Sequence, residues 1–326
     1  MMVVPVRSIL CATLSALAMV VPPVLAQTYP VKPVRLVVGA AAGGPLDLVA
    51  RITAQKLSQL LDQQFVVENR AGAGGTIAGE YVARAPRDGY TLSMGSAATL
   101  CIAPALYPRL SYDPTRDFAP VSVVAAVAFV FVVHPSLPAS SVKEFVALAR
   151  QKPGELRYGS ASSGSATHLA VELFRSMAKI DVVHVPYKGG ALAIVDVLSG
   201  HIEFMFDTIP NSLPHVKAGK VRALGVSSAG RSRLMEAVPT IAEAGVPGYE
   251  ATTWFGVLAP TGTPAEALER LSAATRQAVA SDDVRQRLLA QGYEPQGGTP
   301  QQFAQLIKVE LPKWAKVVQS SGARAD

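Results

Sequence analysis

Residues 34–51 read VRLVVGAAAGGPLDLVAR, and this stretch joins a strand, a glycine turn and a helix. Residues 34–38 are apolar apart from Arg35, which is typical of a strand buried in a parallel sheet. From residue 46 to residue 61 the apolar side chains are spaced as on one face of a helix. Backbone N–H groups at a helix start lack partners within the helix and carry the positive end of the peptide dipoles. The stretch therefore predicts a turn that binds a phosphate or a carboxylate.

The rest of the chain alternates short strand-like runs with helical ones, which is the pattern of parallel βαβ sheets. We expect strands at 34–38, 65–68, 91–95, 118–134, 157–160, 182–185, 203–207, 221–227 and 254–259. We expect helices at 46–61, 74–85, 141–151, 165–178, 191–199, 264–280, 282–291 and 300–321, the last three packing on the first domain.

The apolar run 118–134 is much longer than an ordinary strand and is interpreted as a crossing from one domain to another. The run 254–259 is the return crossing. These positions predict two α/β domains, residues 27–127 plus 255–326 and residues 128–254, joined by crossing strands. Two crossings imply a hinge, with a ligand cleft between the lobes.

The first 26 residues are predicted to be a cleavable signal peptide. Arg7 precedes an uncharged apolar run, and the small residues near Ala26 fit a cleavage site. The alternative is a retained membrane anchor, which the short run and its Pro22–Pro23 break disfavour.

Composition excludes several functional classes. The net charge is +6, but the basic residues form no run, so nucleic acid is not an expected partner. Of the two cysteines only Cys101 remains after cleavage, which leaves neither a disulfide nor a cysteine metal site. No HExxH motif and no phosphate loop ending in Gly-Lys-Ser/Thr occurs, so we expect no metal and no cofactor.

Glycine-rich turns follow strands at corresponding points of both lobes, at residues 42–44, 72–75, 95–97 and 159–165. In open α/β sheets ligands bind beyond the carboxyl ends of the strands, so these turns should converge on the cleft. The alternative is that the glycines only permit tight turns, and for residues 72–75 the two interpretations stay open.

A set of motifs then identifies a family resemblance. The motifs are AGG at 42–44 with Asp47 and Arg51, VENRAGAGG at 67–75, APRDGYTL at 85–92, YGS at 158–160 with His168, VHVPYKG at 183–189, MFD at 205–207, VPT at 238–240, and Trp254 with Gly256. Together they closely resemble the solute-binding receptors of tripartite tricarboxylate transporters, also called the Bug family.

The resemblance implies a two-lobed, type II-like periplasmic binding protein. Such a protein closes on a small organic carboxylate and delivers it to membrane permease subunits. An alternative is a sensor whose closed form contacts a membrane signalling partner. The resemblance also implies a periplasmic location, and we expect a monomer.

In this family the carboxylate is held mainly by backbone amides, small hydroxyls and water from the turns. On that basis we expect first-lobe contacts from Gly43, Gly44, Ser96 and Ala97. We expect second-lobe contacts from Ser162, Ser163, Gly164 and Ser165, at the start of a helix. Thr167, Tyr187 and Asp207 are further candidates.

Three polar residues have a structural interpretation beside a functional one. Asp47 either touches the ligand or accepts backbone N–H bonds and steadies the first turn, since acidic residues suit a helix start. His168 is interpreted as a packed, hydrogen-bonded core residue and not as a base. Lys188 either is solvated or neutralises a second carboxylate.

The first turn departs from the family pattern. Gly39 and Ala40 replace a proline and an aromatic residue, and Pro45 and Leu46 replace a glycine and a small hydroxyl residue. We therefore expect a pocket that is wider and more apolar on the first-lobe side, for an acid larger or less polar than a simple amino dicarboxylate.

A hydrolase is the enzymatic alternative. A nucleophile elbow requires Gly-x-Ser-x-Gly, and Ala161 occupies the serine position between Gly159 and Gly164. The sequence therefore favours a binding protein over an enzyme.

Overall fold

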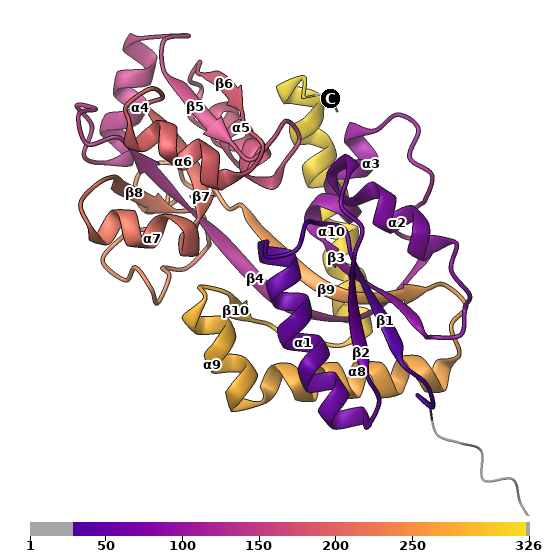
Figure 1. Cartoon of the computed structure of the whole chain (residues 1–326). Coiled ribbons are helices and arrows are strands. Elements are labelled where there is room, and N and C mark those ends of the chain that lie inside the picture. Colours follow the sequence, from indigo (N-terminus) through magenta and orange to yellow (C-terminus); the bar gives the residue numbers. More distant parts are fainter. Residues whose placement is uncertain (1–28, 324–326) are drawn as a thin grey trace, which may run out of the picture.

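Strand β4 (Phe118–Val133) runs through both halves of the computed structural model, which describes residues 29–323 (Figure 1). Residues 118–128 of β4 pair antiparallel with β9 (Thr252–Pro260). Residues 129–133 pair with β7 (Phe204–Thr208), and 130–133 also with β8 (Arg222–Val226). The predicted crossing strands are thus β4 and β9. The predicted signal peptide, residues 1–26, lies outside the described residues.

The first half of the fold combines elements from both ends of the chain. Besides β9 they are β1 (Val34–Val38), α1 (Pro45–Leu61), β2 (Phe65–Asn69), η1 (Ala73–Gly75), α2 (Thr76–Ala83), β3 (Thr91–Ser96), the π-helical turn η2 (Ala98–Ile102), α3 (Ala103–Leu106), α8 (Ala265–Ala280), α9 (Asp282–Ala290), β10 (Glu294–Pro295) and α10 (Pro300–Ser321). β1 lies between β2 and β3, parallel to both, and β9 joins β3 to β4.

The second half contains the middle of the chain. Besides β7 and β8 it has α4 (Val142–Gln151), β5 (Arg157–Ser160), α5 (Ala166–Ala178), β6 (Val183–Pro186), α6 (Gly190–Leu198) and α7 (Ile209–Lys217). β5 lies between β6 and β7 and is parallel to both. In both halves the carboxyl ends of the parallel strands therefore lead into the loops between strand and helix, where ligands bind in such sheets.

The helices cover both faces of each sheet. α1, α8 and α9 close one face of the first sheet through a core that includes Leu57, Leu271 and Leu288. α6 and α7 cover one face of the second sheet, where Ile194 and Ile209 are buried.

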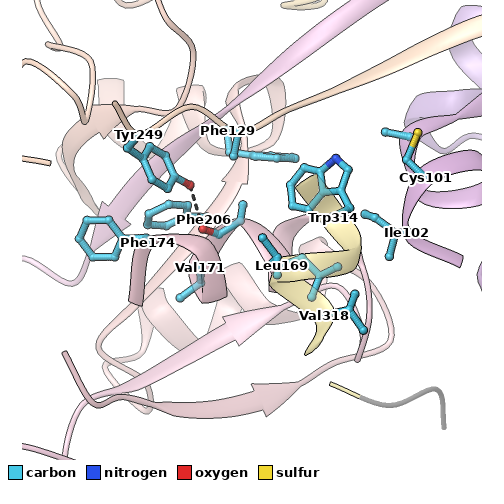
Figure 2. Close-up of a cluster of buried hydrophobic side chains, with 14 of the residues drawn as sticks. Cys101, Ile102, Phe129, Leu169, Val171, Phe174, Phe206, Tyr249, Trp314 and Val318 are labelled. Atoms are coloured by element: carbon cyan, nitrogen blue, oxygen red, sulfur yellow. Dashed lines mark hydrogen bonds between the residues drawn. The ribbon is translucent and has the colours of Figure 1, made fainter. Parts of the chain in front are cut away.

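Helix α10 connects the two halves. The sequence predicts that it packs on the first domain, and it does contact η2, α3 and β4, but it also packs against α5. Figure 2 shows Trp314 of α10 between Ile102 and Leu169, and Trp314 is fully buried. The prediction was therefore incomplete, because one buried face of α10, which includes Phe303, Ile307 and Trp314, contacts elements of both halves.

Most predicted elements are present within a few residues of their expected bounds. The prediction missed η2, α3, α7 and β10. α7 contains two prolines, Pro210 and Pro214, which weaken a helical pattern in sequence. β10 has two residues, too few for a pattern.

Candidate functional site

A cavity of about 390 Å³ lies where the loop after β5 faces the first half of the fold. Its second-half wall is residues 162–166, which includes the predicted contacts Ser162, Ser163, Gly164 and Ser165. Its first-half wall is Ala73, Gly74, Ala98, Ile102, Ala103, Leu106 and Tyr107. The structure thus brings one of the predicted glycine turns, residues 72–75, opposite the predicted second-lobe loop.

The loop 160–165 is fixed by its own hydrogen bonds. Ser165 is the N-cap of α5, and its Oγ accepts the His168 amide at 3.3 Å. The Thr167 hydroxyl accepts the Ala161 amide at 3.1 Å. Ser165 and Thr167 therefore hold the loop in shape, and their oxygens already have partners.

Several donors of the same loop remain available. Ser163 makes no hydrogen bond within residues 29–323. The amides of Ala166 and Thr167 belong to the first turn of α5, where a helix offers no acceptor. None of the hydrogen bonds in the described part of the chain uses these two amides. Unpaired N–H groups at the positive end of a helix favour a bound anion, and α5 has thirteen residues.

His168 has the structural role that the sequence predicts. Its Nδ1 accepts the Gly164 amide at 3.0 Å, and its ring stacks on His184 with centroids 3.8 Å apart. Burial, followed by the neighbouring His184 and Arg175, lowers the pKa of His168 to about 3. The ring is therefore neutral at physiological pH, and its hydrogen bond to the Gly164 amide stabilises the loop.

In the first turn, Asp47 accepts hydrogen bonds from three donors. They are the Gly43 amide at 2.9 Å, Arg51 Nε at 2.8 Å and Asn69 Nδ2 at 2.9 Å. Burial alone would raise the pKa of Asp47, but these hydrogen bonds outweigh burial and lower it. Asp47 therefore steadies the first turn, as in the structural interpretation of this residue. Its carboxylate also occupies the Gly43 amide, which the sequence assigns to the ligand.

The start of α1 consequently offers a different set of donors from the predicted one. The Gly44 amide lies 3.4 Å from the Ala41 carbonyl, and Pro45 has no N–H. The amides of Leu46 and Asp47 follow in the first turn, where no helical acceptor exists. The Leu46 side chain is buried in the core of the first sheet and does not line the 390 Å³ cavity.

The other predicted residues lie away from the cavity. The Ser96 hydroxyl is 3.2 Å from that of Thr99, and Ala97 is fully buried beside Ala98. Tyr187 donates its hydroxyl to Asp196 at 2.6 Å, and burial, with that hydrogen bond, raises its pKa to about 12.

Asp207 is a buried carboxylate next to the start of α6. It accepts from Asn211 Nδ2 at 2.6 Å, from the Ser212 hydroxyl at 2.7 Å and from the Thr208 amide at 2.8 Å. Burial raises its pKa to about 6 despite these bonds. Its oxygens thus bind the first residues of α7 and stabilise the start of that helix. Lys188 is exposed.

Sequence reasoning missed Tyr107, Ala166 and the apolar wall from Ile102 to Leu106. Residues 98–106 carry no helical spacing, because a π-helical turn interrupts the period. Ala166 could have been named, since the first amides of any predicted helix are unpaired.

Between residues 29 and 323, no group of three or more His, Cys, Asp or Glu side chains is placed to hold a metal ion. In the same range no helix has both the length and the apolar character needed to cross a membrane.

Residues 49–323 match the family model described as the tripartite tricarboxylate transporter family receptor. The chain belongs to this receptor family. A protein encoded in the tcbD-tcbE intergenic region of Pseudomonas sp. strain P51 is 40% identical over 93% of this chain and 91% of its own length. Protein BugT of Bordetella pertussis is 38% identical over 95% of each chain.

Solved structures of the family have the same fold. R. palustris Rpa4515, solved with adipate, has 40% identity and a TM-score of 0.82 over 91% of this chain and 99% of its own. MatC from Rhodopseudomonas palustris, solved with bound malate, has 35% identity and a TM-score of 0.78 over 89% of this chain and 100% of its own. The chain therefore has the two-lobed α/β fold that the sequence predicts, and it shares this fold with receptors solved with adipate and with malate.

Proposed function

We propose that this receptor captures a dicarboxylate with a short apolar chain in the cavity between the loop 162–166 and Gly74. The observation that carries the proposal is the set of unpaired donors at the start of α5, Ser163 and the amides of Ala166 and Thr167. One carboxylate accepts these donors, which are held in place by Ser165, Thr167 and His168.

The opposite wall favours an apolar chain over a hydroxylated one. Ile102, Ala103 and Leu106 line the cavity and offer no side-chain hydrogen-bond partner. A hydroxyl placed against them would lose its water without gaining a partner, which costs about 1–3 kcal/mol. Of the ligands in the two similar structures, adipate has a chain that suits this wall better than malate does.

We also propose where and how the receptor works. Residues 1–26 are removed on export, and the mature protein acts in the periplasm as a monomer with no cofactor and no enzymatic activity. Its lobes are residues 27–127 plus 255–326 and residues 128–254, divided at the crossing strands. The closed form contacts membrane permease subunits; contact with a signalling protein is the alternative.

The experiment is calorimetric titration of the processed protein with adipate, malate and the neutral diamide of adipate. We expect adipate to bind most tightly and the diamide not to bind, because only a carboxylate uses the helix-start charge. Ser163→Ala should weaken adipate binding about tenfold, the effect of one hydrogen bond to a charged group. Ser199→Ala is the matched control, since that exposed hydroxyl donates to the Val195 carbonyl at the end of α6 and does not line the cavity. Equal binding of adipate and its diamide would refute the proposal.

A further inference from the structure

A second and larger cavity lies at the crossing strands and shares no lining residue with the cavity at the loop 162–166. Its volume is about 700 Å³, and it is lined by β4, the start of β9, the segment 228–233, the segment 292–298 and the start of α10. None of the predicted ligand contacts lines it. It is therefore a separate site in the same molecule.

The floor of this hinge cavity is apolar and contains one unsatisfied donor. Val123, Ala126, Ile209 and Leu306 contribute aliphatic surface. Trp254 lines the cavity and is 3% exposed, yet its indole Nε1 has no hydrogen-bond partner in the described chain. A buried donor without a partner destabilises the fold, so an acceptor bonded to it would be stabilised.

The rim adds groups of both charges that have no partner among residues 29–323. Arg233 makes no ion pair or hydrogen bond there, whereas its neighbour Arg231 is bound to Glu243 at 2.9 Å. Glu250 and Glu294 also line the cavity, and their carboxylates are free of ion pairs. The cavity thus presents a free cation for an acceptor and two free carboxylates for a cation, and the unpaired Trp254 N–H is buried in its lining.

From this arrangement we propose that the hinge cavity is a second binding site for a small zwitterion with an apolar body, of the amino acid or dipeptide class. The ligand carboxylate pairs with Arg233 and accepts the Trp254 N–H. The ligand ammonium pairs with Glu250 or Glu294, and the apolar side chain covers the aliphatic floor. A single acid or a single amine satisfies only half of these groups.

The test titrates the purified processed protein with leucine and with leucyl-leucine, followed by calorimetry and tryptophan fluorescence. The chain has two tryptophans, and the indole of Trp314 is fully buried and bonded to Glu310 at 2.6 Å. A change in emission on binding therefore reports on Trp254. The matched control ligands are N-acetyl-leucyl-leucine and leucyl-leucinamide, which lack one charge each. The separate titrations with leucine and with leucyl-leucine distinguish a free amino acid from a dipeptide.

Arg233→Ala is the deciding variant because the side chain is exposed, and the exposed Arg285→Ala, on α9 outside the cavity, is its control. We expect one of the two zwitterions to bind to the unaltered protein. Its binding should be at least tenfold weaker in Arg233→Ala and in Trp254→Phe. Either control ligand should also bind the unaltered protein at least tenfold more weakly. Excess adipate should not displace the zwitterion, and Arg233→Ala should leave adipate binding unchanged. Three results would overturn the proposal: binding of neither zwitterion at millimolar concentration, binding that Arg233→Ala leaves intact, or displacement by adipate.

Discussion

Replacing Asp47 by asparagine tests how the first turn is held. The carboxylate is 2% exposed and accepts three hydrogen bonds, from Gly43, Arg51 and Asn69. Two of the three donors recover water when the bonds are lost, because Gly43 and Arg51 are exposed. Asn69 keeps its bond to the Ala40 carbonyl at 3.0 Å. We therefore expect Asp47→Asn to lower the free energy of unfolding by about 2 kcal/mol, which is the contribution of one buried charged hydrogen bond and not of three.

The pH dependence of that loss provides a second, independent check. Hydrogen bonds hold the pKa of Asp47 below its usual value, so its contribution is present above the unfolded pKa of about 4 and disappears as the pH falls through the folded pKa. Thermal unfolding at pH 7 should show the midpoint of Asp47→Asn lowered by roughly 4–8 °C. At pH 3 the two proteins should unfold closer together. The exposed Asp181→Asn should change neither value. A loss below about 0.5 kcal/mol at pH 7, or an equal loss at both pH values, would show that the ionised Asp47 does not hold the first turn.

Three further predictions concern the second lobe and the helix that joins it to the first. Gly164→Ala should lower the free energy of unfolding by roughly 2–4 kcal/mol in urea titrations, because φ is +70° and a Cβ would overlap Leu106. A neutral effect would show that the lobes do not touch at this position. His168 should remain neutral between pH 5 and 8 in NMR titrations, and stability should decline as the pH falls below the unfolded histidine pKa of about 6.5; a titration near 6.5 would contradict its burial. Trp314→Ala should cost about 3–5 kcal/mol by the same urea measurement, and a loss under 1 kcal/mol would mean that α10 does not join the two halves.

The sequence was sufficient for the architecture because the deciding signals are local. Residues 34–51 show a strand, a turn and a helix by composition and spacing alone. The helix predicted at 300–321 is present as α10, and a capping box of Thr299 and Gln302 closes its start. The long apolar run of β4 was enough to predict a crossing between lobes.

The binding site was only partly predictable, since it depends on which amides are already paired. Gly43 is an obvious donor in sequence, but the fold brings Asp47 to its amide. Leu46 follows a glycine turn and looks like a cleft residue, yet helix geometry directs it into the core. Residues 98–106 form a cavity wall through a π-helical turn, which has no recognisable period. Each of these features depends on tertiary contacts, which a local sequence pattern does not predict.

A crystal structure of the processed protein with adipate would show directly whether the start of α5 holds the ligand. We expect one ligand carboxylate within hydrogen-bond distance of Ser163 and of the amides of Ala166 and Thr167, with the chain against Ile102 and Leu106. Adipate bound elsewhere, with these donors still unpaired, would contradict this expectation.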